Sequence, residues 1–128
     1  MSAASLYIGL MSGTSCDGVD GVLAHFGDDP ESFRLMATCH QPFESSFRAQ
    51  LHALQYGASF LEDPFHAAAC AANTLMDVCA EVVRCLLVRC QVSAAEIAAI
   101  GCHGQTIRHR PEAEYTLQIH NAARLVEK

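Results

Sequence analysis

The stretch YIGLMSGTSCDGVDGV, residues 7–22, begins as a short apolar segment and then changes to glycine, hydroxyl and acidic residues. Leu6–Met11 has the composition of a buried strand, and Val19–Phe26 that of a second strand, closed by the turn signal Gly27–Pro30. The polar segment between them is therefore predicted to be a loop that joins two strands.

Two interpretations of this loop remain open. Glycine and hydroxyl residues can turn several backbone N–H groups toward one point, and such a nest attracts phosphate oxygens. Ser12, Thr14 and Ser15 would add hydroxyl donors, and Asp17 and Asp20 could hold Mg²⁺ or its water shell. The composition also suits an ordinary hairpin, because Ser-Gly and Asp-Gly are common turn dipeptides. No GxxxxGK[ST] motif occurs, so a nucleotide site here would not be a Walker loop.

The next elements are one strand and two helices. Phe33–Cys39 is a third candidate strand, so the chain is expected to begin with a meander. Ser45 or Ser46 is expected to cap a helix that Gly57 ends. A long helix is predicted from the Asp63-Pro64 start signal to about Cys90. Its apolar stripe consists of Ala68, Ala71, Ala72, Leu75, Cys79, Val82, Val83 and Leu86.

The last third of the chain returns to strands. Ser93 and Glu96 have the spacing of a capping box ahead of a strand at Ala98–Cys102. Tyr115–Ile119 alternates as a further strand, and Asn121 can cap a short final helix. A helix that short is marginal by itself, so the sequence is expected to be the first part of a larger protein. The order of elements predicts an α/β domain with a mixed sheet and flanking helices.

A second polar segment, GCHGQTIRHRP at residues 101–111, begins at the end of the Ala98–Cys102 strand and is predicted to be a loop. Loops in that position commonly face the ligand crevice of an open α/β sheet, and Gln105 and Thr106 would suit sugar hydroxyls. His103 and His109 have no third metal-ligating residue at the spacing of a structural metal site, so no such site is predicted here. Neighbours on a strand point to opposite faces, so Cys102 and His103 are not expected to form a nucleophile pair.

Composition excludes several classes of function. Fourteen acidic against eight basic residues give a formal charge of −6, which argues against a nucleic-acid partner. The N-terminus lacks a basic region and a long apolar run, so no membrane association is expected and a cytoplasmic location is predicted. Seven cysteines without a CxxC pair indicate neither a disulfide framework nor a thiolate metal site. The four in the long helix are expected to pack in the core, and Cys16 and Cys102 are expected in loops.

Taken together, GLMSGTSCDGVDGVL and, some 80 residues later, IGCHGQTIRHRP followed by YTLQI resemble the bacterial anhydro-N-acetylmuramic acid kinases. The resemblance covers nearly all of these 128 residues and about the first third of such a kinase. It implies the first domain of the actin-like (ribonuclease H-like) ATPase fold, incomplete at its C-terminus. It also implies ATP and Mg²⁺ as cofactors, an amino sugar as the small-molecule partner, and is compatible with a homodimer of the full-length protein.

The resemblance assigns roles by position, with a phosphate loop at residues 9–22 and a sugar-cleft loop at residues 101–111. The implied ATP-binding residues are Gly13, Thr14, Ser15, Cys16, Asp17, Gly18, Val19 and Asp20. The implied substrate-binding residues are His103, Gly104, Gln105 and Thr106. Asp17 and Asp20 are the candidates for holding Mg²⁺ through water.

The implied reaction transfers the γ-phosphoryl group of ATP to the 6-oxygen of 1,6-anhydro-N-acetylmuramic acid while water opens the anhydro bridge. The family's catalytic aspartate lies in a later block, so no catalytic residue is expected up to Lys128 and the chain alone is expected to be inactive. Two alternatives remain: a non-catalytic nucleotide- or sugar-binding fragment, or an actin-like kinase for another sugar. His120 stands where the family usually has glycine, which predicts strain if that turn needs a positive φ.

Overall fold

A computed structural model describes residues 5–29, 31–57 and 62–128. These residues form a single five-stranded sheet in the order β3-β2-β1-β4-β5. The strands are β1 (Ser5–Ser12), β2 (Gly18–Phe26), β3 (Arg34–Pro42), β4 (Ile97–Arg110) and β5 (Tyr115–Ile119). The helices are α1 (Ser45–Gln55), α2 (Pro64–Cys90) and α3 (Ala122–Glu127), with 3₁₀ turns η1 (Ala94–Glu96) and η2 (Pro111–Ala113).

The predicted meander is confirmed, because β2 pairs antiparallel with both β1 and β3. β1 also pairs in parallel with β4, so the sheet is mixed, as expected. Along β1, Ile8, Leu10 and Ser12 are buried while Tyr7 and Met11 are exposed. This alternation assigns one face of the sheet to the core and leaves the other open.

The prediction of a loop at residues 101–111 is wrong, and so is the expectation that Cys102 lies in a loop. These residues belong to β4, which runs on to Arg110 and turns only at η2. Gly104 interrupts the ladder with a φ of +77°, and the pairing of β1 with β4 shifts in register between Leu10 and Ser12. Beyond this irregularity, β4 pairs antiparallel with β5. The glycine-containing sequence therefore marks a bulge in a long strand rather than its end.

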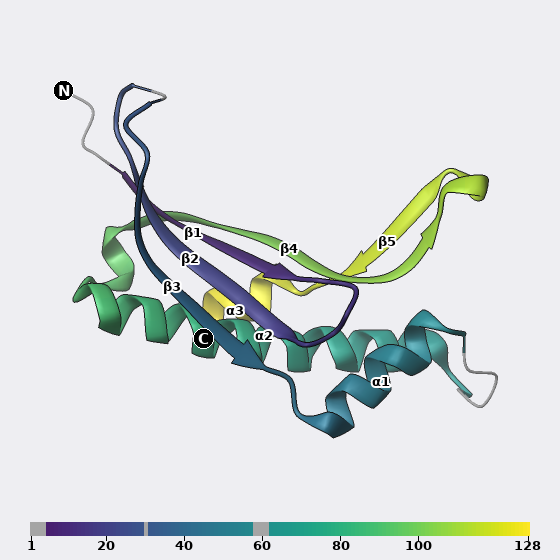
Figure 1. Cartoon of the computed structure of the whole chain (residues 1–128). Coiled ribbons are helices and arrows are strands. Elements are labelled where there is room, and N and C mark those ends of the chain that lie inside the picture. Colours follow the sequence, from purple (N-terminus) through teal and green to yellow (C-terminus); the bar gives the residue numbers. More distant parts are fainter. Residues whose placement is uncertain (1–4, 30, 58–61) are drawn as a thin grey trace.

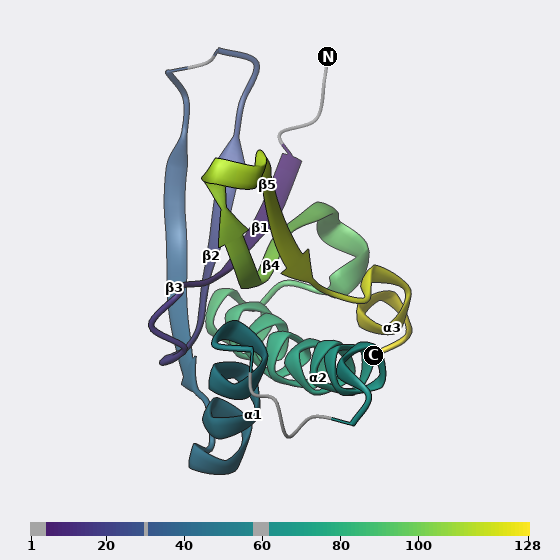
Figure 2. The same ribbon diagram turned by 90° about the vertical axis from the view of Figure 1, so that its right-hand side faces the viewer.

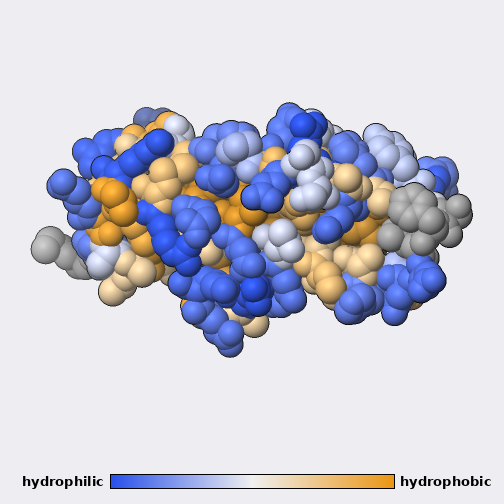
Figure 3. Space-filling view, turned by 90° about the horizontal axis from the view of Figure 1, so that it is seen from below, coloured by the Kyte–Doolittle hydropathy of each residue, from blue (hydrophilic) through white to orange (hydrophobic). Residues whose placement is uncertain are grey.

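Helices α1 and α2 lie on one face of the sheet (Figures 1 and 2). The predicted stripe of α2 is confirmed: Leu75, Cys79, Val82 and Leu86 are all buried against the sheet. The helix passes so close to β2 that a Cβ atom at Gly21 would lie 2.3 Å from Val82. Viewed from below, this helical side carries hydrophilic residues with apolar ones between them (Figure 3).

Most of the predicted helix ends are confirmed. The Asp63 side chain accepts from the N–H of His66, the Asn121 side chain accepts from the N–H of Arg124, and Ser93 and Glu96 form a capping box. The prediction for α1 is wrong, because its N-cap is Glu44, without a side-chain cap bond, and not Ser45 or Ser46.

The expectation for the cysteines of α2 holds only in part. Cys79 is buried and Cys85 and Cys90 are partly buried, but Cys70 is exposed. The expected strain at His120 is also not found, because His120 is not among the described non-glycine residues with a positive φ.

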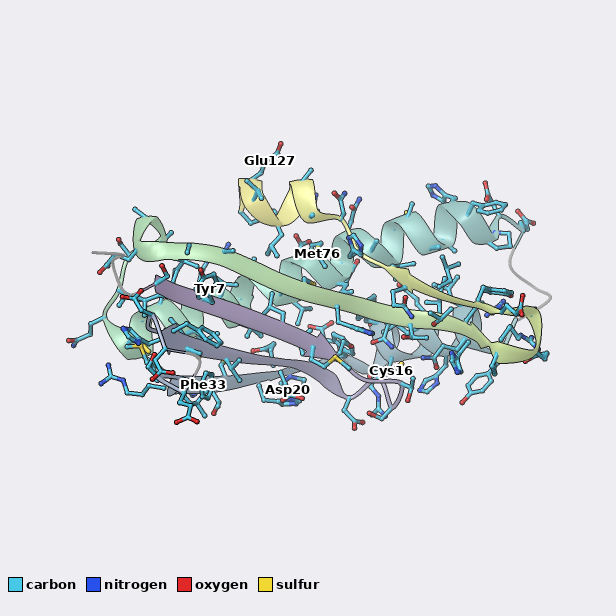
Figure 4. All side chains as sticks on the ribbon, turned by 90° about the horizontal axis from the view of Figure 1, so that it is seen from above. Tyr7, Cys16, Asp20, Phe33, Met76 and Glu127 are labelled. Carbon is cyan, nitrogen blue, oxygen red and sulfur yellow. The ribbon has the colours of Figure 1, made fainter. Side chains whose placement is uncertain are left out.

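The other face of the sheet is not covered by a helix in the described ranges (Figure 4). It presents Tyr7, Met11 and Val22 from β1 and β2, and the β2–β3 hairpin adds Phe26 and Phe33; each of these side chains is more than a third exposed. The rings of Tyr7, Phe26 and Phe33 contact one another, and exposed apolar groups of this kind commonly mark an interaction surface.

Helix α3 is held to α2 by polar contacts. Arg124 donates from Nε and Nη2 to the two carboxylate oxygens of Asp77, both at 3.0 Å, and Asn121 donates to Asn73. These hydrogen bonds from Arg124 hold the pKa of Asp77 below its usual value. Among the described helices, none has the length and hydropathy that crossing a bilayer requires.

Candidate functional site: the β1–β2 loop and the distal half of β4

The loop between β1 and β2 is a tight turn with a buried centre. The N–H of Cys16 donates to the carbonyl of Gly13 at 3.1 Å, and Cys16 adopts a left-handed φ of 56°. The Cys16 side chain is buried, which raises the pKa of its thiol, and Gln55 of α1 donates to its sulfur at 3.2 Å. Cys16 therefore anchors the loop instead of facing a ligand.

The far side of the loop is fixed by a close backbone approach. A Cβ atom at Gly18 would lie 2.3 Å from the carbonyl oxygen of Gln41 and 2.8 Å from the Cα atom of Pro42. The carbonyl of Asp17 accepts from the N–H of Phe43 at 3.0 Å. Only glycine fits between the start of β2 and the end of β3, so the loop leaves the sheet at a fixed place.

Gln105 of β4 ties the loop to the second motif. Its side chain is fully buried, accepts a hydrogen bond from the Ser12 hydroxyl and donates from Nε2 to the carbonyl of Gly13 at 3.0 Å. A buried amide whose donor and acceptor both have partners holds its neighbours in one geometry. The glutamine predicted to meet a sugar is thus the residue that positions the phosphate-loop candidate.

Gln55 makes a second connection between the two motifs. It is the last residue of α1, and its Nε2 donates to the carbonyl of Thr14 at 3.4 Å and to that of Thr106 at 3.1 Å. Helix α1 therefore stabilises the loop and β4 together.

The tip of the loop remains available. Thr14 and Ser15 are exposed, and their N–H groups take no part in the hydrogen bonds formed within the described part of the chain. Two neighbouring N–H donors with two hydroxyl groups can receive an anionic oxygen. This tip is the part of the loop that could bind phosphate.

The two predicted metal-binding carboxylates have separate partners. Asp17 Oδ1 accepts from Arg48 Nη2 at 3.5 Å, and Asp20 Oδ1 lies 2.7 Å from His40 Nδ1. Both side chains are mostly exposed, at 65% for Asp17 and 70% for Asp20. Within residues 5–29, 31–57 and 62–128, no cluster of three His, Cys, Asp or Glu side chains could hold a metal ion directly. Binding through water is the arrangement that these exposed carboxylates suit.

The predicted sugar-binding residues are divided between two positions. Thr106 lines a polar groove of about 440 Å³ together with Thr14 of the loop. The other lining residues are Gln55, Tyr56, Ile107, Arg108, His109, Arg110 and Glu112. His103 is exposed outside this groove, and its Nδ1 lies 3.2 Å from the carbonyl of Gly104. A Cβ atom at Gly104 would lie 2.6 Å from the carbonyl of Ile119, so this glycine shapes the strand.

The sequence prediction missed several residues that build the site. Gln55 lies on a helix with no recognisable motif, and nothing in its local sequence distinguishes it from a surface glutamine. Arg48 and His40 pair with the two aspartates from other elements, which no local spacing could reveal. Ser12 was identifiable as a hydroxyl group next to the loop, although not as the donor to Gln105.

Comparison with known proteins agrees with the two motifs. The sequence profile described as "Anhydro-N-acetylmuramic acid kinase" matches residues 5–128. The anhydro-N-acetylmuramic acid kinase of Variovorax paradoxus strain S110 is 46% identical over an alignment of 129 residues that covers 98% of this chain and 33% of that protein. The one from Thiobacillus denitrificans is 49% identical over 121 residues, or 94% and 31% of the two chains. The chain thus spans about a third of the length of these curated relatives.

The five-stranded mixed sheet with its helices defines the chain as an α/β protein, and the matched profile is that of a sugar kinase. More particularly, the chain belongs to the anhydro-N-acetylmuramic acid kinase family.

Proposed function

We propose that the full-length protein carrying this chain phosphorylates 1,6-anhydro-N-acetylmuramic acid with ATP. Water opens the anhydro bridge in the same reaction, and the product is N-acetylmuramic acid 6-phosphate, an intermediate of peptidoglycan recycling. Membership of the family supports this function. The observation that carries it is the buried Gln105 side chain, which joins the β1–β2 loop to the second family motif.

The ATP-binding segment in this proposal is Gly13–Asp20. The exposed N–H and hydroxyl groups of Thr14 and Ser15 receive phosphate oxygens, while Cys16, Gly18 and Val19 hold the loop in place. Asp17 and Asp20 would hold Mg²⁺ through its water shell, where the ion would neutralise charge on the phosphates. The rigid base of the loop would keep these donors in position, so little free energy is spent on ordering them when ATP binds.

The sugar is proposed to meet the protein along His103–Thr106, close to the loop. Thr106 and Thr14 line the same polar groove, whose volume of about 440 Å³ is in the usual range for a small-molecule site. A threonine hydroxyl both donates and accepts, which suits the hydroxyl groups of a sugar. Gly104 and Gln105 act here by shaping β4 and not by facing the ligand.

These 128 residues form part of the first domain of an actin-like, ribonuclease H-like kinase in this proposal. The apolar open face of the sheet is then covered by other parts of the full-length chain, which is consistent with relatives about three times as long. The catalytic aspartate that activates water is assigned to those parts, so the chain alone is inactive. We further propose a cytoplasmic location, and a homodimer of the full-length protein.

The proposal is tested by incubating the full-length protein with Mg²⁺, ATP and the anhydro sugar in ¹⁸O-labelled water. The expected product has gained one phosphoryl group and one water molecule, with the label in the new hydroxyl group. N-acetylglucosamine and N-acetylmuramic acid serve as comparison substrates. Binding of ATP without turnover of the anhydro sugar, or turnover of a comparison sugar alone, would contradict the proposal.

A further inference from the structure

Two pairs of cysteines connect α2 with the sheet. Cys79 of α2 and Cys102 of β4 line the same small cavity, and Cys85 of α2 is close enough to Cys39 of β3 to raise the pKa of its thiol. All four are free thiols. Both pairs lie between α2 and the sheet but have different surroundings. The reactivity of one pair can therefore be compared with that of the other.

The Cys79–Cys102 pair combines a buried thiol with a more accessible one. Cys102 aligns with the core residue Leu10 in the parallel pairing, which turns its side chain toward α2. Both cysteines line the same small cavity under the sheet, and Cys79 is only 2% exposed. Cys102 is partly buried and also lines a pocket of about 290 Å³ with Met76, at the position labelled in Figure 4, and His120. A small oxidant can therefore approach Cys102, with Cys79 behind it.

The surroundings also give the two thiols different acidities. The neighbouring Cys79 thiol lowers the pKa of Cys102, against the effect of burial. The backbone N–H of Gly104 and the nearby imidazoles of His120 and His103 also lower it. The neighbouring Cys102 thiol and burial raise the pKa of Cys79. In the other pair, burial and the contact with Cys85 raise the pKa of Cys39. Cys102 is therefore the cysteine of these pairs whose pKa is lowered, and the thiolate is the reactive form of a cysteine.

We propose that Cys102 and Cys79 form a peroxide-sensitive modification site, with Cys102 as the attacking sulfur and Cys79 as the resolving one. The Cys102 sulfur attacks one oxygen of hydrogen peroxide, the O–O bond breaks, and hydroxide leaves as sulfenic acid forms. The Cys79 sulfur then attacks the Cys102 sulfur, and the hydroxyl group leaves with the Cys79 proton as water. The two thiols lose two electrons in total, peroxide gains them, and two water molecules form overall.

The disulfide would join α2 to β4 three positions before Gln105, the residue that fixes the β1–β2 loop. Both contact pairs offer two sulfurs, but only the Cys79–Cys102 pair combines thiolate character with an open pocket. Selective oxidation of one pair over the other is therefore the result that distinguishes this proposal from general thiol oxidation.

The test treats the reduced full-length protein with hydrogen peroxide at neutral pH, blocks the remaining thiols with N-ethylmaleimide and identifies tryptic peptides by mass spectrometry. Cleavage at arginine places Cys79 in peptide 49–84 and Cys102 in peptide 90–108, which become linked. These peptides also contain Cys70 and Cys90, so fragmentation is needed to assign the linked sulfurs. We expect the Cys79–Cys102 link to form roughly ten times faster than any link between Cys39 and Cys85.

Single variants provide the second arm of the test. In Cys79→Ser, the resolving sulfur is absent, so dimedone is expected to trap a sulfenic acid at Cys102. In Cys102→Ser, both the linked peptide and any dimedone adduct at Cys79 are expected to be lost. Equal oxidation of both pairs in the unmodified protein, or no adduct at Cys102 in Cys79→Ser, would overturn the proposal.

Discussion

The two ends of the sheet are held by different kinds of contact. Where β1 turns into β2, buried polar groups of Ser12 and Gln105 and the close approach at Gly18 fix the chain. Where β2 turns into β3, Phe26 contacts Tyr7 and Phe33 through rings whose centroids lie 5.5 and 5.2 Å away, and all three remain partly exposed. A satisfied polar network specifies one geometry, whereas apolar contacts tolerate repacking. The first end therefore has the fixed geometry that a ligand-binding loop needs, whereas the second leaves aromatic rings open to further contacts.

The largest expected effect is at Gly104, which combines a positive φ with close approach to a backbone carbonyl. Gly104→Ala should lower the free energy of unfolding by about 2–4 kcal/mol, because the new Cβ atom adds both backbone strain and overlap with Ile119. The matched control is Gly101→Ala in the same strand, where a Cβ atom would meet nothing within 4 Å. Urea denaturation of the full-length protein measures the free energy of unfolding of both variants. Equal losses of stability would show that β4 is not constrained at Gly104.

The second-largest effect is expected from a substitution in the polar network that joins Gln105 to Ser12 and Gly13. Gln105→Leu removes the partner of the Ser12 hydroxyl and of the Gly13 carbonyl, so the expected loss of stability is about 2–3 kcal/mol. The affinity for ATP should fall with it, because the loop loses its support. Gln50→Leu, on the exposed side of α1, is the control and should leave both quantities nearly unchanged. An unaltered ATP affinity in the Gln105 variant would show that the support of this loop by Gln105 does not contribute to nucleotide binding.

At the β2–β3 end of the sheet, substitutions should lower the stability less and should mainly reduce the exposed apolar surface. Phe33→Ser removes one exposed ring contact, with an expected loss of at most about 1 kcal/mol. In the 128-residue chain, whose described helices leave this face of the sheet uncovered, the fluorescence of a bound hydrophobic dye should fall. Phe65→Ser, which removes an exposed ring on the helical side, is the comparison. A larger decrease in dye fluorescence for Phe65→Ser than for Phe33→Ser would mean that the open face is not the main apolar surface.

The smallest effect is expected at the partly buried ion pair between α2 and α3. The pKa of Asp77 is lowered by Arg124 in the folded state, so the pair stabilises the fold above the unfolded pKa of about 4. This contribution is lost as the pH falls through the lower, folded-state pKa. Asp77→Asn should therefore reduce stability slightly at neutral pH, and less so in high salt. Glu81→Gln, which breaks an exposed pair within α2, is the control and should not alter the contact with α3.

The sequence predicted those parts of the fold that depend on local patterns. The meander, the stripe of α2 and the caps at Asp63, Ser93 and Asn121 follow from periodicity and side-chain chemistry, and all are confirmed. The extent of β4 was missed because a glycine among polar residues has the composition of a turn, although here it forms a bulge between two pairing partners. The role of Gln105 as a buried link could not be predicted, because Ser12 lies 93 positions away in the sequence.

In the function proposed above, the loop held by Gln105 binds the phosphates of ATP. The most direct test is a crystal structure of the full-length protein with Mg²⁺ and a non-hydrolysable ATP analogue. A phosphate oxygen is expected about 3 Å from the N–H of Thr14 or Ser15, with the Ser12–Gln105 hydrogen bond still in place. Phosphates bound elsewhere, with the tip of this loop contacting only solvent, would contradict it.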